Sequence, residues 1–143
     1  MAGATRMGYE GQLLYGTAGS TAATLVTNCV DLDYDTAAEK APTTVRGAGT
    51  TPPIETERVT SIKPTITWKM LNKPADTTLS ALVAAARTGA AVALRTKSYS
   101  AGTGYDGDCT LSVKNGMTLK GEASFDFTAT ATDDEGRAPL LNA

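Results

Sequence analysis

The stretch VTSIKPTITWKML, Val59 to Leu71, alternates apolar and polar residues with the two-residue period of a β-strand. Each set would lie on a face of its own, with Ile62, Ile66, Trp68 and Met70 opposite Lys63, Thr65, Thr67 and Lys69. An antiparallel sheet commonly buries one face and leaves the other in solvent, so this pattern predicts a half-buried strand of such a sheet. Pro64 has no amide hydrogen to donate, and we therefore expect a sheet edge or a bulge there.

A second stretch, NCVDLDYD, alternates in the same way from Asn28 to Asp35. Its apolar residues should share one face and its acidic residues the other: Val30, Leu32 and Tyr34 against Asp31, Asp33 and Asp35. The acidic spacing matches the start of an EF-hand loop, which needs Gly at the sixth place and Glu at the twelfth. Thr36 and Pro42 stand there instead, which excludes calcium binding of that kind. A solvated strand face and a surface that repels another polyanion remain open.

The segment ADTTLSALVAAARTG, Ala75 to Gly89, predicts an amphipathic helix. Its apolar residues recur at the spacing i, i+3, i+4 and i+7: Leu79, Leu82, Val83 and Ala86. Asp76 or Thr77 can cap the first turn, and Gly89 is the expected end. Because the helix is apolar on one side only, we expect it to pack on a sheet.

The rest of the chain is typical of short strands joined by turns. Asn115–Gly116 lies between two alternating runs and predicts a hairpin with a type I′ turn. The Thr-, Pro- and Gly-rich residues 36–58 predict a long hairpin loop with extended arms. We expect a single domain over 1–143 with roughly seven strands and one helix. An irregular N-terminal arm should cover about residues 1–8, and a tail about 132–143.

Composition and charge argue against several functions. The 143 residues are 41% hydrophobic and hold 13 Lys+Arg against 15 Asp+Glu, a net charge of −2 with no basic excess to grip nucleic acid. No histidine is present, which removes the usual general base and the commonest metal ligand, so we expect neither an enzyme nor a cofactor or metal site. The longest apolar run, ALVAAA, is too short to span a bilayer. Cys29 and Cys109 are expected to be free thiols.

The motif GTGYDG, Gly102 to Gly107, matches the glycine pattern of dinucleotide-binding proteins. That fingerprint also requires a helix to begin at the motif, so that its N-terminus meets the pyrophosphate. A strand pattern, DCTLSVK, follows instead. A flexible loop is therefore the better prediction.

Taken in order, these features resemble the major tail tube protein of long-tailed, siphovirus-type bacteriophages. The features are GYEGQLLYGTAGST before ATLVTNCVDLDYD, the TTVRG arm of a long loop, the Trp-bearing SIKPTITWKMLN, a helix running into a strand in KPADTTLSALVAAARTGAAVAL, and the closing GEASFDFTATAT. The resemblance covers roughly residues 8–132. The Thr-Pro-Pro loop tip departs from it.

The resemblance implies a mainly β fold: an antiparallel β-sandwich or small barrel with one flanking α-helix. It also implies a homohexameric ring that stacks into a tube, assembled in the host cytoplasm and located in the virion tail, through which DNA is ejected. Its partners would be further copies of itself and the tail terminator, tape measure and distal tail proteins. Double-stranded DNA would pass without specific binding, and no membrane would be involved.

Two groups of residues follow as hypotheses from this resemblance. A basic pore wall would hold DNA by releasing its counterions, so an acidic face suits the lumen: Asp31, Asp33, Asp35, Glu122 and Asp126. The long loop would bridge subunits or rings through Arg46, Gly47, Gly49, Thr50, Pro52, Pro53, Glu55 and Arg58. The alternatives are the tube protein of a contractile tail or type VI-like secretion system, a monomeric β-sandwich binding module, and a hydrolase with paired carboxylates.

Overall fold

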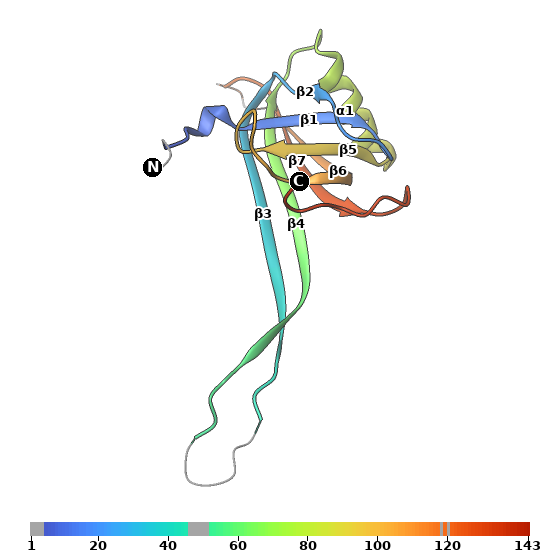
Figure 1. The fold of residues 1–143 in the computed structure, drawn as a ribbon. Coiled ribbons are helices and arrows are strands. Elements are labelled where there is room, and N and C mark those ends of the chain that lie inside the picture. Colours follow the sequence, from blue (N-terminus) through green and yellow to red (C-terminus); the bar gives the residue numbers. More distant parts are fainter. Residues whose placement is uncertain (1–4, 46–51, 118, 120) are drawn as a thin grey trace.

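Seven antiparallel strands form one curled sheet in the part of the chain that the computed structural model describes, residues 5–45, 52–117, 119 and 121–143 (Figure 1). They are β1 (Gln12–Thr17), β2 (Thr24–Leu25), β3 (Cys29–Pro42), β4 (Glu57–Leu71), β5 (Val92–Lys97), β6 (Asp106–Gly116) and β7 (Ser124–Thr132). A 3-10 turn, Gly8–Glu10, precedes β1, and helix α1 (Thr77–Thr88) joins β4 to β5. The predicted mainly β, antiparallel fold with one flanking helix is confirmed.

The order of strands in the sheet is β2-β1-β5-β6-β7-β4-β3, so β2 and β3 are its two edges. Figure 1 shows that β1 and β5 lie across the direction of β3 and β4, because the sheet twists strongly along its width. The sandwich or small barrel therefore takes the form of a half-barrel made by one continuous sheet. Its core lies on the inner side of this curl.

The inner face of β4 supplies the centre of the core, as its alternation predicts. Ile66, Trp68 and Met70 are all buried. Trp68 pairs with Phe127 of β7 in register, and their rings stack with centroids 5.0 Å apart. The pairing of β4 with β7 begins only at Thr65, so at Pro64 the strand has a neighbour on its β3 side alone. The predicted edge at this proline is confirmed.

Helix α1 begins and ends where the sequence predicts. The Asp76 carboxylate accepts hydrogen bonds from the amides of Thr78 and Leu79, at 3.1 and 3.4 Å, and Gly89 ends the helix with a φ of 77°. Strand β5 pairs with β6 only as far as Cys109. The helix contacts β6 and contributes its buried side chains to the core. Within the described residues no helix has the length and apolarity that crossing a bilayer requires.

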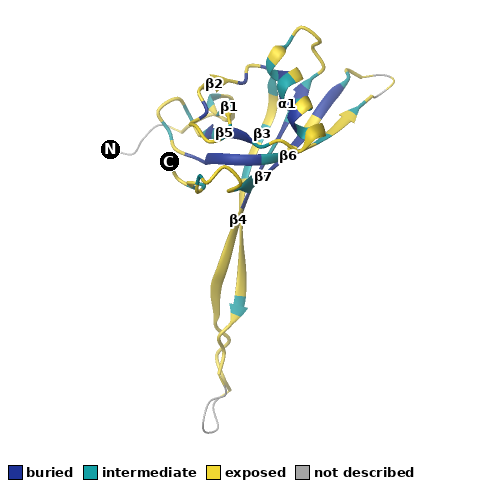
Figure 2. Ribbon diagram, turned by 90° about the vertical axis from the view of Figure 1, so that its right-hand side faces the viewer, coloured by how far each residue is buried: buried dark blue, intermediate teal, exposed yellow. Residues whose placement is uncertain are grey.

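Beyond the core, β3 and β4 continue together as a long two-stranded arm (Figures 1 and 2). The strands stay paired from Ala37 opposite Lys63 to Pro42 opposite Glu57. We call these residues, 37–42 and 57–63, the arm, and the other strands with α1 the head. The loop predicted over 36–58 is therefore strand at both of its ends, because residues 36–42 belong to β3 and residues 57–58 to β4. The apolar residues Val59 and Ile62 are three positions apart, so the two-residue period of the inner part of β4 does not continue through the arm.

Two local predictions are wrong because pairing across the sheet overrides them. Asn115 and Gly116 belong to β6 and pair with Phe125 and Ser124, so the connection follows them instead of turning at them. In β3 the register shifts between Cys29 and Leu32, which oppose Met70 and Trp68. The extra residue of this bulge puts Cys29 and Leu32 on the inner face and leaves Val30 exposed.

Candidate assembly surfaces

The sheet has a second face, opposite the core, which is polar across β3, β4, β7 and β6. Strand register arranges it in three rows: Asp35, Thr65, Thr130 and Thr110; Asp33, Thr67, Thr128 and Ser112; Lys69, Asp126 and Lys114. Each of these side chains is at least partly exposed. Hydroxyl groups fill the middle of the face, and charges lie toward its ends.

Four of the five carboxylates predicted to line a pore lie on or beside this polar face. Asp33 and Asp35 begin two of its rows, and Asp126 occupies the third. Asp31, at the bulge, lines the same shallow hollow of about 340 Å³ as Asp33 and Asp126. Glu122 is separate, because it lies in the connection before β7 and not in the strand. The sequence could not place it, since the alternation of β7 extends back through its position.

The polar face is mixed in charge and not uniformly acidic. Asp126 lies directly between Lys69 on β4 and Lys114 on β6. Directly opposite residues of antiparallel strands have their Cβ atoms about 5 Å apart, so these two cations offset the carboxylate locally. The acidic set is thus brought together with basic partners that the sequence hypothesis did not include.

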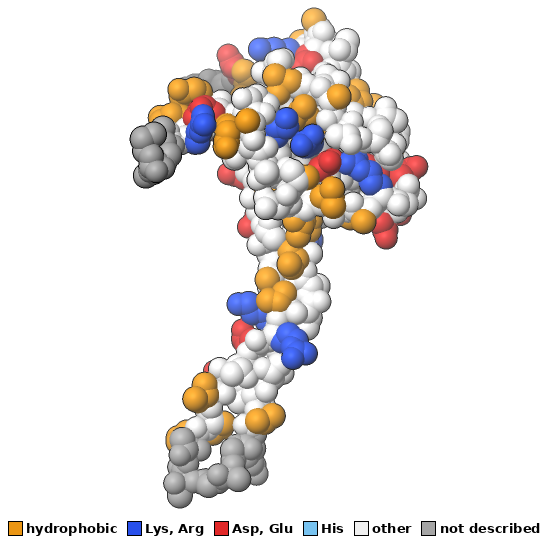
Figure 3. All heavy atoms as spheres, viewed as in Figure 1, with side chains coloured by type: hydrophobic (Ala, Val, Ile, Leu, Met, Phe, Trp, Pro, Cys, Tyr) orange, Lys and Arg blue, Asp and Glu red, His pale blue; other side chains and the backbone are white. Residues whose placement is uncertain are grey.

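The arm has one apolar and one polar side, and both are exposed. Ala38 opposes Ile62, and Lys40 opposes Val59, on the same side as the core face of the head. A bulge at Thr60 keeps Val59 and Ile62 on this side, where each is 49% exposed. Figure 3 shows hydrophobic side chains and basic residues along this part of the molecule. We call Ala38, Val59 and Ile62 the arm stripe.

Four of the eight residues predicted to bridge subunits lie at the outer end of the arm. Pro52, Pro53, Glu55 and Arg58 are exposed there, and Arg58 is already part of β4. Arg46, Gly47, Gly49 and Thr50 lie outside the described residues.

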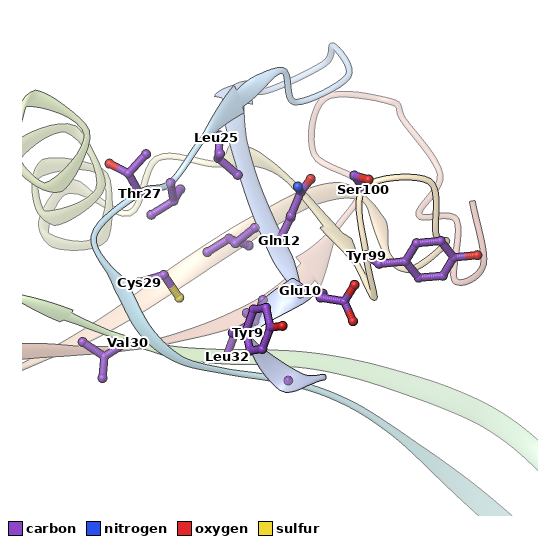
Figure 4. Close-up of a pocket in the computed structure, with 14 residues that line it drawn as sticks. Tyr9, Glu10, Gln12, Leu25, Thr27, Cys29, Val30, Leu32, Tyr99 and Ser100 are labelled. Carbon is purple, nitrogen blue, oxygen red and sulfur yellow. The ribbon is translucent and has the colours of Figure 1, made fainter. Parts of the chain in front are cut away.

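A cleft of about 670 Å³ opens between the two edges of the curled sheet (Figure 4). We call it the edge cleft, and Tyr9, Leu13, Leu25, Cys29, Val30 and Leu32 are among its lining residues. Leu25 comes from β2, while Cys29 and Leu32 come from β3 (Figure 4). Glu10 is the charged residue among those described around it. Hydrogen bonds from the Met7 amide and the Arg6 side chain lower the pKa of Glu10, which keeps its carboxylate ionised.

A buried ionic cluster joins the segment after β7 to strand β6 in the head. Arg137, in the segment after β7, forms ion pairs with Asp106 and Asp108 of β6. The Asp108 carboxylate, which is 0% exposed, also accepts hydrogen bonds from the Gly19 amide at 3.0 and 3.1 Å. Arg137 further donates to the Ser20 carbonyl at 2.7 Å. Because burying an unpaired carboxylate is costly, this arginine fixes the tail and the β1–β2 turn to the sheet.

The tail and the glycine motif are tied into this cluster. Asp106 and Leu140 exchange backbone hydrogen bonds of 2.8 Å, and Gly104 and Ala143 exchange a second pair. Strand β6 begins at Asp106, so a strand and not a helix follows the motif, as predicted. The motif itself is firmly packed, because Tyr105 is fully buried and donates to the Asp108 carbonyl at 3.0 Å. The sequence analysis did not identify this cluster, because Arg137 is distant in sequence from Asp106 and Asp108 and no local pattern links them.

Both cysteines are free thiols, as predicted. Burial, with a smaller contribution from the Asp31 carboxylate, raises the pKa of Cys29 to about 11. Burial likewise raises the pKa of Cys109 to about 11, and its thiol donates to the Tyr105 hydroxyl at 3.4 Å. Neither thiol is therefore appreciably ionised near neutral pH.

Comparison with known proteins identifies the fold. No protein-family model and no curated protein matches the sequence. The structure is similar to a chain in the tail of an empty gene transfer agent particle with C6 symmetry, at 16% identity and a TM-score of 0.73, covering 97% of this chain and 100% of that one. The chain has the fold of a tail tube subunit.

Two further structures share this tail tube fold. A structure of the SPP1 tail tube is 10% identical with a TM-score of 0.69, covering 97% of this chain and 80% of that one. A chain in the virion of a native gene transfer agent particle is 15% identical with a TM-score of 0.70, covering 97% and 100%. The similarity extends over nearly the whole chain.

Proposed function

We propose that this protein is the structural subunit of a virion tail tube, in which hexameric rings stack into a conduit for DNA. The observation that carries this proposal is the tail tube fold, matched over 97% of the chain to a tail with C6 symmetry and to the SPP1 tail tube. The subunit would act by assembly and not by catalysis. Its location would be the virion, after assembly in the host cytoplasm.

Ring closure would use the free edges of the curled sheet. Strand β3 is an edge along its whole length, so its outward amide and carbonyl groups have no strand beside them in the described chain. An exposed edge of this length pairs readily with another chain, which is normally an aggregation hazard. A head-to-tail contact that closes on itself converts the hazard into a ring of limited size.

The polar face of β3, β4, β7 and β6 would form the wall of the pore. Its carboxylates Asp31, Asp33, Asp35 and Asp126 would lie beside Lys69, Lys114 and a band of threonine and serine hydroxyls. DNA carries roughly one negative charge per 1.7 Å of helix axis, and a basic wall would hold it by counterion release. A wall whose cations are balanced by carboxylates would let DNA slide without specific binding. Glu122 would lie beyond this wall.

The tube would also need proteins at its two ends and in its lumen. Tail terminator, tape measure and distal tail proteins are the partners that this role requires. The exposed outer arm, from Pro52 to Arg58, would supply contacts between subunits or rings.

Electron microscopy and light scattering of the purified protein test the proposal. We expect hollow tubes or six-membered rings that grow with protein concentration. A monomer at every concentration would contradict the tube and favour a binding module. In a helical reconstruction of the tubes, the row of Lys69, Asp126 and Lys114 should face the axis. Finding that row on the outer surface would contradict the assigned wall.

A further inference from the structure

We infer that the arm stripe of one copy docks in the edge cleft of another copy. The inference rests on the proposed tube, because it needs copies of this chain to meet head to tail. Beyond the proposed tube, the inference specifies which surface receives the arm and which side of the arm binds there. Three features of the molecule support it: the exposed stripe, the shape and chemistry of the cleft, and the distance between them within one chain.

The arm exposes apolar surface that a single copy does not cover. Val59 and Ile62 are half exposed although they continue the face that is buried in the head. Farther out, Val45 and Ile54 are 78% and 82% exposed. A two-stranded ribbon is at best marginally stable in water unless another strand or surface packs against it. Docking would bury the apolar side of the arm, and this burial would also stabilise its two paired strands.

The edge cleft offers a complementary surface. It lies where the curl fails to close, so it is open on the side between β2 and β3 (Figure 4). Leu25 and Tyr9 are exposed at it, while Leu13 and Leu32 continue it into the core. An apolar strand face inserted there would extend the core of the receiving head.

Charge does not oppose this pairing. Lys40 lies directly opposite Val59 and therefore on the apolar side of the arm. The charged residue described around the edge cleft is the Glu10 carboxylate, whose Arg6 partner is itself more than half exposed. A lysine that arrives with the stripe would meet the ion pair of Glu10 and Arg6, which carries no net charge, so charge does not oppose docking.

The occupant must come from another copy. In Figures 1 and 2 the arm runs away from the head. Ile62 opposes Ala38, nine residues along β3 from Cys29, which at about 3.3 Å per residue is roughly 30 Å. The contact joins two different surfaces, so each added copy exposes a new cleft and a new arm, as stacking requires.

Disulfide trapping tests this contact. Native Cys29 is a poor probe because its thiol ionises only at about pH 11, so the test variant carries Cys29→Ser, Leu25→Cys and Ile62→Cys. A disulfide needs Cα atoms within roughly 7 Å, which excludes bonding within one chain across the distance above. After oxidation of assembled protein, we expect a ladder of linked chains on a non-reducing gel. The matched control replaces Ile62→Cys by Ala37→Cys, on the polar side of the arm.

The ladder should be at least about tenfold stronger with Ile62→Cys than with Ala37→Cys, and a reductant should remove it. Tubes in which both variants link equally, or not at all, would overturn the docking site and leave the tube intact. Wild-type protein that forms no tubes would overturn the proposed function, and the docking inference with it. Microscopy of the same samples distinguishes the two failures.

Assembly of charge variants provides a second readout. Ile62→Asp should lower the yield of sedimentable tubes at least about tenfold, because it places a carboxylate in an apolar cleft beside Glu10. Ala37→Asp adds the same charge opposite Lys63, on the other side of the arm, and should change the yield less than about twofold. Both sites are exposed, so both subunits should keep the wild-type unfolding midpoint. Equal loss of tubes in the two variants would contradict the inference.

Discussion

The apolar residues in the two halves of β4 lie on the same side of the strand, yet their surroundings differ. From Ile66 to Met70 the apolar side chains are buried against β7 and the core, whereas Val59 and Ile62 are half exposed on the arm. The strand is continuous, and its pairing with β3 runs through both halves. The difference shows that one strand can serve two purposes: folding the subunit in its inner half, and presenting a surface to another copy in its outer half.

The head therefore holds the folding free energy, and the arm depends on assembly. Truncating one apolar residue in each half of β4 tests this difference directly. Trp68→Ala should lower the free energy of unfolding by about 3–5 kcal/mol, because it removes a buried ring stacked on Phe127. Ile62→Ala should change it by less than about 1 kcal/mol in the monomer. Urea unfolding of dilute, monomeric protein measures both, and equal losses would show that the arm is part of the folding core.

The second prediction concerns the ionic cluster of Arg137, which attaches the tail to the sheet of the head. Arg137→Ala should lower the free energy of unfolding by about 3 kcal/mol, because it leaves the buried carboxylate of Asp108 without its cation. The matched control is Arg6→Ala, which removes an exposed ion pair with Glu10 and should change stability by about 0.5 kcal/mol or less. If the two variants unfold at the same urea concentration, the ionic cluster does not hold the tail to the sheet.

The smallest expected effect is a loss of stability at alkaline pH that arises in the head. Burial raises the pKa of Cys109 from 9.0 to about 11, so folding favours the neutral thiol. This contribution is fully present below pH 9, and it is lost as the pH rises from 9 to about 11, because the unfolded chain ionises first. The decline should approach about 2 kcal/mol. Cys109→Ala should make the thermal midpoint fall less steeply between pH 9 and 10, but it should not abolish the fall, because the pKa of Cys29 is raised to the same value. An unchanged fall would contradict the assignment to Cys109.

Much of the head could be predicted from its sequence because the signals there are local. The capping residues Asp76 and Gly89 mark the ends of α1, and the period of two identifies the buried side of β4. Signals of the same local kind failed where partners across the sheet decided the outcome. Asn115–Gly116 has the preferences of a tight turn, but Phe125 and Phe127 must face the core, and their register draws both residues into β6.

The candidate surfaces were predictable in part for the same reason. Alternation correctly put Asp33, Asp35 and Asp126 opposite apolar residues, so three carboxylates of the polar face follow from the sequence. Their neighbours Lys69 and Lys114 come from other strands, and only strand register shows that they flank Asp126. The edge cleft has no sequence signal, because residues of the Gly8–Glu10 turn, β2 and β3 meet there through the curl.

Local patterns in the sequence predicted helix α1 and the inner half of β4, and the side of each that is apolar. These properties depend on neighbours within a few positions, since backbone geometry fixes the periods of strand and helix. Tertiary structure decided whether each apolar side is covered: the same side of β4 is buried at Trp68 and exposed at Ile62. It also decided the partners of buried charges, as when Arg137 reaches a carbonyl 117 residues away at Ser20. Such contacts depend on how the whole sheet curls, and no local pattern encodes them.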